Sequence, residues 1–166
     1  MPTTGLSTLL RGGPGLHAGA MDMDRNGLEI LDRAECLHLL SGSVLGRIAV
    51  TVGALPVILP VNFLLDGDRI LIRTGKGTKL EAATRDAVVA FEVDDVEPFS
   101  HSGWSVCVTG RATELRDDEV ARVASLPLPH WAPSGTEHVV AVSVDFVTGR
   151  RLSHPSPAGS LSEKSV

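Results

Sequence analysis

The fold is decided by residues 46–74, which read GRIAVTVGALPVILPVNFLLDGDRILIRT. Three apolar runs rich in β-branched residues are separated by the short turns GA and DGD. Such runs favour extended chain, and glycine in the connections favours tight hairpins. We therefore expect three consecutive antiparallel strands, at 46–52, 56–65 and 69–74.

A helix is expected just before this stretch. Asp32 can cap its N-terminus by accepting from a free backbone N–H, and Glu35 can reach back to the cap. Leu31 and Cys36 are spaced to pack together as a hydrophobic staple. The helix should end near Gly42.

Beyond this stretch, strands alternate with two short helices. Strands are expected over 87–94, 103–115 and 138–146, and helices over 78–83 and 117–125. Six strands joined mostly by short turns predict a mainly β protein built as a six-stranded antiparallel barrel. Regular strand–helix alternation is absent, which argues against a doubly wound nucleotide-binding sheet.

The chain of 166 residues is expected to form one domain. Residues 1–27 and 153–166 are rich in Gly, Ser, Thr and Pro, and we expect flexible tails around a folded unit at 28–152. The N-terminus lacks the apolar run of a signal peptide, and no stretch of about 18 apolar residues could span a membrane. A cytoplasmic protein without membrane contacts is therefore expected.

The charge balance and the cysteines narrow the function classes. Fifteen Lys and Arg residues against twenty Asp and Glu residues give a net charge of −5, which argues against a nucleic-acid-binding module. Cys36 and Cys107 form no CxxC pair and have no histidine at metal-ligand spacing. We expect two buried, reduced thiols and no metal site.

The segment 73–80, RTGKGTKL, has the composition of an anion site. Its glycines let a ligand approach the backbone, and the N-terminus of the following helix exposes free N–H groups. Such a site would suit a phosphate monoester, although the spacing is not that of a P-loop. A solvated glycine turn before a capped helix explains the same residues about equally well. The cations are Arg73, Lys76 and Lys79, and the hydroxyl donors are Thr74 and Thr78.

Two other segments carry weaker signals. Pro60 cannot donate to a strand ladder and so belongs at an edge or bulge, beside the hydrogen-bonding amide of Asn62. Trp104 and Trp131 lie near expected loops, where an indole could stack on a planar ring, although ordinary core packing explains either one. No nucleophile or catalytic triad stands out, which favours chemistry carried by a cofactor.

Taken in order, these segments resemble the FMN-binding split-barrel family that is similar to pyridoxamine 5′-phosphate oxidase. The similarity is nearest to its small actinobacterial, nitroimidazole-reductase-like members and covers about 31–152. The ordered set is more specific than any one motif. It comprises VLGRIA (44–49), LPVNF (59–63), IRTGKGTKL (72–80), AFEVD (90–94), GWSVCVTGRA (103–112) and TGRRL (148–152).

This resemblance implies a six-stranded split barrel that forms a homodimer, with FMN at each subunit interface. Pro60, Val61 and Asn62 would run beside the flavin ring. The ribityl chain and phosphate would be held by Thr74, Thr78 and Lys79, with help from Arg73 or Lys76. Ser105 and Trp104 would approach from the partner subunit, and Trp131 would cover the flavin.

The resemblance implies an FMN-dependent oxidoreductase that passes hydride through flavin N5 to or from a small planar substrate. The short segment at 150–154 departs from the Arg/His signature of true pyridoxamine phosphate oxidases, so synthesis of pyridoxal phosphate is not expected. Arg73 stands where many nitroimidazole-reductase relatives have His. Two alternatives stay open: a reductase of the same fold that uses a deazaflavin coenzyme, and a non-catalytic flavin- or haem-binding sensor or storage protein.

Overall fold

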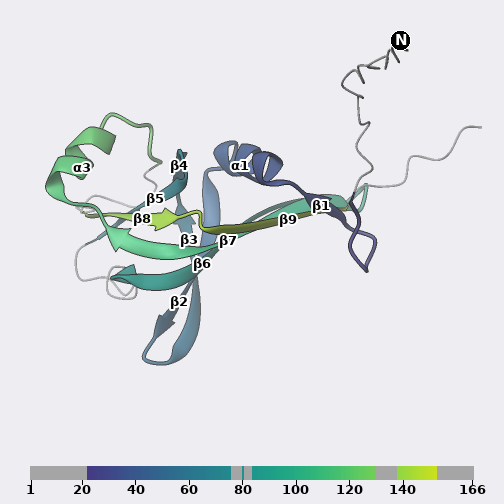
Figure 1. The fold of residues 1–166 in the computed structure, drawn as a ribbon, viewed down its shortest axis with the longest axis horizontal. Helices are drawn as coiled ribbons and strands as arrows, with labels where there is room; N and C mark the ends of the chain where they lie inside the picture. Colours follow the sequence, from purple (N-terminus) through teal and green to yellow (C-terminus); the bar gives the residue numbers. More distant parts are fainter. Residues whose placement is uncertain (1–21, 76–79, 81–83, 130–137, 153–166) are drawn as a thin grey trace, which may run out of the picture.

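The computed structural model describes residues 22–75, 80, 84–129 and 138–152. Within these ranges the chain forms nine antiparallel strands, and the described helical segments include α1 and α3 (Figure 1). The elements are β1 (Glu29–Leu31), α1 (Arg33–Ser41), β2 (Leu45–Val52), β3 (Leu55–Asn62), β4 (Leu64–Asp66), β5 (Arg69–Thr74), β6 (Ala87–Glu97), β7 (Ser102–Glu114), α3 (Asp117–Val123), β8 (His138–Ser143) and β9 (Phe146–Leu152).

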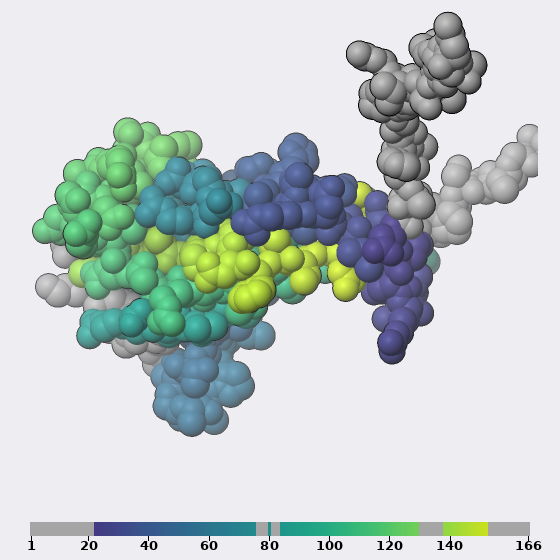
Figure 2. Space-filling model, viewed as in Figure 1, coloured from purple at the N-terminus to yellow at the C-terminus, as the bar shows by residue number. Residues whose placement is uncertain are grey.

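One sheet joins the nine strands, and β7 is its central member. The order along the sheet is β3-β2-β6-β7-β8-β5-β4, and β9 pairs with both β7 and β1. Figure 1 shows β8, β5, β4 and α3 gathered on one side of the molecule and β9 and β1 extending to the other. In Figure 2 the β2–β3 hairpin projects from the body. The predicted mainly β, split-barrel class is confirmed.

The predicted count of six strands is wrong, and Phe63 is the first reason. It divides the strand expected at 56–65 into β3 and β4. The backbone N–H of Phe63 still donates to the carbonyl of Val44, but its fully buried side chain packs edge-on against Phe91, with ring centroids 4.8 Å apart. The next residue, Leu64, pairs with Leu71 of β5. The chain therefore leaves β2 for β5 at this residue.

Two further strands account for the rest of the difference. The strand expected at 138–146 ends at Ser143 as β8, a separate strand β9 begins at Phe146, and β1 pairs with β9. Residues 103–109 of β7 pair with β9, whereas residues 112–114 pair with β8. Gly110 lies at this change of partner, where a Cβ atom would stand 1.7 Å from the carbonyl oxygen of Ser143. Only a residue without a side chain lets β8 end so close to β7.

The predicted cap of α1 is confirmed. The side chain of Asp32 accepts from the backbone N–H of Glu35 at 2.8 Å. Leu31 and Cys36 are both buried, as a staple requires. Gly149 of β9 lies under them, since a Cβ there would meet the Cys36 sulfur at 2.6 Å. Glycine thus lets α1 lie directly on β9.

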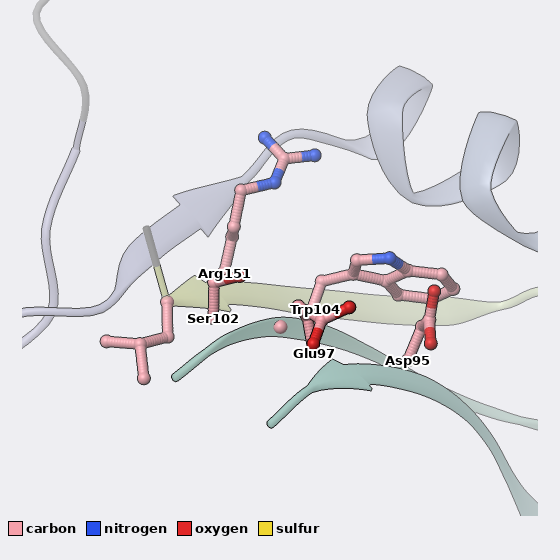
Figure 3. Close-up of a pocket in the computed structure, with 7 residues that line it drawn as sticks. Asp95, Glu97, Ser102, Trp104 and Arg151 are labelled. Carbon is pink, nitrogen blue, oxygen red and sulfur yellow. The ribbon is translucent and has the colours of Figure 1, made fainter. Parts of the chain in front are cut away.

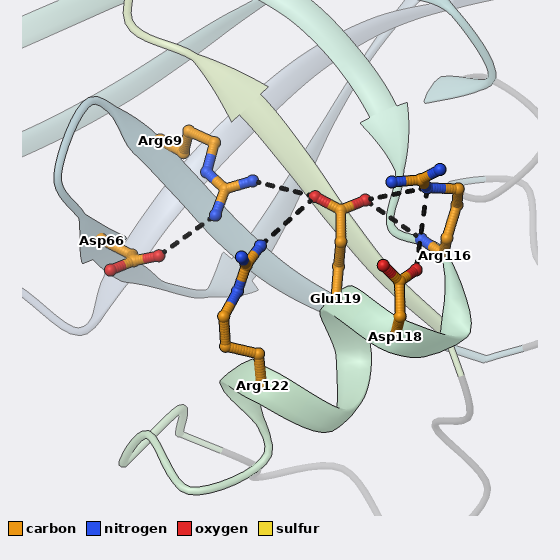
Figure 4. A network of polar contacts seen from close by, with 6 residues as sticks. All are labelled: Asp66, Arg69, Arg116, Asp118, Glu119 and Arg122. Atoms are coloured by element: carbon orange, nitrogen blue, oxygen red, sulfur yellow. Dashed lines mark hydrogen bonds and ion pairs between the residues drawn. The ribbon is translucent and has the colours of Figure 1, made fainter.

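The helix α3 covers a second, smaller core formed by the other face of β5 and β8. The carboxylate of Glu119 joins this helix to the β4–β5 hairpin, because it meets Arg69, Arg116 and Arg122 (Figure 4). The backbone N–H of Arg116 and these guanidinium groups lower the pKa of Glu119. The network therefore ties α3 to the barrel.

The prediction of two buried thiols is correct for Cys36 and wrong for Cys107, which is exposed. Alternate residues of a strand face opposite sides, and the neighbours Val106 and Val108 take the core side. Among the described residues, no group of three or more potential ligands could hold a metal ion. No helix in the described ranges has the length and apolar character needed to cross a membrane.

Candidate functional site

The ends of β3 and β5 bring predicted site residues together. Leu64, two residues after Asn62, pairs with Leu71, two residues before Arg73. The strands β3 and β5 are also in contact. Two segments separated in sequence thus meet at one end of the barrel, as a shared binding site requires.

Arg73 has an unsatisfied donor at this barrel end. Its Nε is buried and has no hydrogen-bond partner in the described part of the chain. A buried donor without a partner is costly, and a guanidinium is well suited to pair with an anion such as phosphate. This nitrogen is the strongest local indication that the site takes an anionic ligand.

Arg73 and Thr74 point to opposite sides of β5. Thr74 is buried on the side of Ile70 and Ile72, which face the main core, whereas Arg73 shares the side of Leu71. Thr74 is also the last residue of β5. One ligand can therefore reach both side chains only beyond the end of this strand.

The turn after β5 is described only in part. The predicted residues Lys76, Thr78, Lys79 and Trp131 lie outside the described residues. Leu80 and Thr84 are helical, and the Thr84 hydroxyl donates to the Leu80 carbonyl at 2.7 Å. This agrees with a helix after the turn, while most of the helix predicted at 78–83 lies outside the described ranges.

Pro60 lies on an edge strand, as its missing N–H predicts, because β3 ends the sheet order. Pro60 is paired with Arg47 of β2. The Asn62 side chain donates to the Val44 carbonyl at 3.2 Å, so it ties the end of β3 to the start of β2. These contacts hold the segment beside Arg73 in place.

Ser105 and Trp104 lie elsewhere on the sheet. Ser105 pairs with Asp94 of β6, so β2 and β6 stand between it and Asn62. Three strand spacings amount to about 14 Å. Within one chain, Ser105 and Asn62 are therefore too far apart to touch the same group of atoms.

Trp104 and Ser105 also face opposite sides of β7. The indole packs against the main core on the side of Val106, whereas Ser105 shares the outer face with Cys107. A ligand lying on the outer face would meet Ser105 directly and Trp104 only near the sheet edge. The structure therefore separates two residues that the sequence placed in one motif.

A groove of about 610 Å³ adjoins Ser105 and extends to Trp104 and Arg150. Sequence analysis missed the acidic residues along it, Glu92 and Asp94, which both pair with the guanidinium of Arg47. Their alternation along β6 could have placed them on one face, but nothing local shows that this face adjoins Ser105. The groove has the size of a small-molecule site.

The family model described as pyridoxamine 5′-phosphate oxidase matches residues 32–151. This chain belongs to that family. The family resemblance read from the ordered motifs is thereby confirmed.

Three relatives illustrate the family likeness. The uncharacterized protein Rv0080 of Mycobacterium tuberculosis is 41% identical over 145 residues, covering 84% of this chain and 94% of its own. The FAD binding protein from Mycobacterium smegmatis is 36% identical, with a TM-score of 0.61 over 76% of this chain and 99% of its own. A putative pyridoxamine 5′-phosphate oxidase from Corynebacterium glutamicum is 34% identical, with a TM-score of 0.69 over 78% and 96%.

Exposed apolar side chains lie on the outer face of the sheet, beside the ion pairs of Arg47 with Glu92 and Asp94. Ile58, Val88 and Phe146 are 66%, 65% and 74% exposed. A shallow depression of about 270 Å³ includes Ile58. Exposed large apolar side chains that gather on one face are typical of an interaction site.

Proposed function

We propose that this chain binds a flavin nucleotide, FMN, and works as an oxidoreductase on a small planar substrate. The observation that carries the proposal is the buried, unsatisfied Nε of Arg73 at the barrel end where β3 and β5 meet. Membership of the pyridoxamine 5′-phosphate oxidase family supports it. So does the 36% identity to a protein named for FAD binding.

The residues at this end fit the parts of FMN. Arg73 and Thr74 would hold the phosphate and ribityl oxygens beyond the end of β5. Pro60 and Val61 offer an apolar edge for the flavin ring, and Asn62 adds a polar group beside it. When bound, the flavin would supply hydride transfer through N5, and the chain would supply binding, orientation and exclusion of water.

We propose FMN in preference to FAD because the segment 73–80 provides cations for a single terminal phosphate. A dinucleotide would need a further site for its adenosine half. FAD is the second candidate because of the M. smegmatis relative. A deazaflavin carries a long acidic tail, which the net charge of −5 of this chain does not favour.

The site is proposed to be shared by two copies of the chain. The separation of about 14 Å between Asn62 and Ser105 is the reason, since a Ser105 from a second copy would be needed to meet the part of the flavin ring beside Asn62. The exposed apolar residues Ile58, Val88 and Phe146 give that copy a surface to bury. A homodimer would thus complete the site.

The first experiment is the absorption spectrum of the purified protein, with the released chromophore identified by mass. A two-banded flavin spectrum and the mass of FMN are expected, with a solution mass of two chains. The mass of FAD would overturn the choice of FMN and keep flavin binding. A deazaflavin, or a colourless protein that FMN does not restore, would overturn flavin binding itself.

A second experiment tests for catalysis. Anaerobic reduction of the bound flavin by a nicotinamide nucleotide is expected for an oxidoreductase. A bound flavin that no nicotinamide donor reduces would favour a sensor or storage protein, the non-catalytic alternative.

A further inference from the structure

A pocket of about 390 Å³ lies at the edge of the sheet, around the indole of Trp104 (Figure 3). We call it the Trp104 pocket and define it by Asp95, Glu97, Trp104 and Arg151. It combines an indole with an excess of carboxylates. We infer that this pocket binds a small organic cation, an ammonium or guanidinium group carried on a small molecule.

The strand register places these side chains in one row. Trp104 of β7 pairs with Asp95 of β6 on one side and with Arg151 of β9 on the other. Residues directly opposite in a sheet project to the same face, so both flank the indole. Figure 3 shows the Asp95 carboxylate beside the indole, while the guanidinium of Arg151 is directed away from it.

Arg151 is already neutralised by other residues. Its guanidinium meets Glu35 of α1 at 2.5 Å and Glu29 of β1 at 3.5 Å. These carboxylates raise the pKa of Arg151 although burial lowers it. Arg151 therefore has little charge left to offset the acids on the other side of the indole.

Asp95 and Glu97 are the acids without a cation. Within the described ranges neither takes part in an ion pair, and Glu97 accepts only the backbone N–H of Phe99, at 3.1 Å. Residues two apart on a strand share a face, so both carboxylates border the same pocket. Because the guanidinium of Arg151 is paired with Glu29 and Glu35 outside the lining, the two lining carboxylates give the pocket a negative potential.

An organic cation fits this arrangement better than a metal ion. Two carboxylates provide few of the oxygen ligands that calcium takes, and no group of three or more potential metal ligands occurs in the described ranges. The face of an indole attracts ammonium and guanidinium groups, and Trp is the most favourable side chain for this contact. A second groove of about 450 Å³ reaches the indole from α1 and shares Asp95, which widens access to it.

The test is a titration of the full-length protein with benzylamine, which is cationic near neutral pH, and with uncharged benzyl alcohol. Binding is read from the NMR signal of the Trp104 indole N–H, assigned with a Trp131→Phe variant. Benzylamine should bind saturably and at least about tenfold more tightly than benzyl alcohol. Equal binding of the two, or no saturable shift, would overturn the inference.

Variants separate charge recognition from simple packing. Asp95 is exposed, so Asp95→Asn should fold and weaken benzylamine about tenfold with no change for benzyl alcohol. Asp118→Asn, at the other end of the molecule on α3, is the matched control and should change neither. Benzylamine binding that Asp95→Asn leaves intact would overturn the inference. Asp95 and Glu97 alternate with Asp94 and so face away from Ser105, although Trp104 also lines the groove beside Ser105. The Asp95→Asn effect therefore tests cation binding, whereas the released chromophore tests flavin binding, and either result can fail without the other.

Discussion

The two ends of the sheet differ in whether their arginine side chains are paired with carboxylates. At the β5 end, Arg73 keeps a buried nitrogen without a partner among the described residues. At the β7–β9 end, two arginines are paired with carboxylates: Arg150 with Asp24, and Arg151 with Glu29 and Glu35. We propose an anion for the first end and an organic cation for the second.

This difference distinguishes arginines that hold the fold together from an arginine that could bind a ligand. An arginine paired with carboxylates of its own chain mainly positions strands, and exposed pairs of this kind contribute little stability. An arginine with a buried, unmade hydrogen bond has a cost that an anionic ligand would remove. The proposed anion site therefore rests on the buried Nε of Arg73, which has no partner in the described ranges, and not on the number of arginines.

The largest effect is expected where β7 changes partner between the two ends. Gly110→Ala places a Cβ 1.7 Å from the Ser143 carbonyl oxygen, and we expect the free energy of unfolding to fall by about 3 kcal/mol. Urea unfolding measures it. Gly67→Asn is the control, because Gly67 has a φ of 61° and open space around it. Equal midpoints for the two variants would show that β8 does not need this close approach.

At the β5 end we expect a smaller effect, on the affinity for FMN. Arg73→Gln removes the guanidinium, and FMN affinity should fall about ten- to a hundredfold, as expected for a charged hydrogen bond worth about 1.5–3 kcal/mol. Calorimetric titration of the FMN-free protein measures it. Arg69→Gln on the same strand is the control, since Arg69 pairs with Asp66 and Glu119 instead. Equal losses in both variants would remove Arg73 from the site.

At the β7–β9 end we expect the smallest effect, on how stability changes with pH. The backbone N–H groups of Leu28 and Asn26, followed by Arg150, lower the pKa of Asp24 below its ordinary 3.8. A lowered pKa in the folded state gives stability that is present above pH 3.8 and lost as the pH falls through the lowered value. The stability difference between the wild type and Asp24→Asn should therefore vanish in acid.

Two measurements examine this region. Unfolding of the wild type and Asp24→Asn across pH gives the difference, and NMR titration gives the pKa directly. Arg150→Gln should raise the pKa of Asp24 only in part, because the backbone hydrogen bonds are the larger cause. A full return of the pKa to its ordinary value in Arg150→Gln would show instead that the ion pair is the main cause of the lowering.

Local chemistry made most of the strands predictable. Gly53 and Ala54 adopt positive φ in the β2–β3 turn, and Gly67 does so before β5, as expected for tight hairpins. The cap at Asp32 was predictable for the same reason, since its partner lies three residues away. The ordered motifs also sufficed to recognise the family, because each one is a short continuous segment.

The site was only partly predictable. Arg73, Thr74 and Asn62 could be named from a glycine-rich turn and an edge proline. That they meet at one end of the barrel depends on Phe63, whose burial against Phe91 carries the chain from β2 to β5. No local pattern encodes that contact, because the two phenylalanines are distant in sequence.

By itself, the sequence determined most of the strands, two hairpin turns, the capped helix and the family, because these rest on interactions between near neighbours. Only the tertiary structure decided that β7 is shared by β8 and β9 and that Cys107 is exposed. It also decided that Arg150 and Arg151 are paired with carboxylates, whereas the buried Nε of Arg73 has no partner in the described ranges. These properties depend on strand register and on pairs of residues far apart in the chain, and a register is set only when the whole sheet assembles.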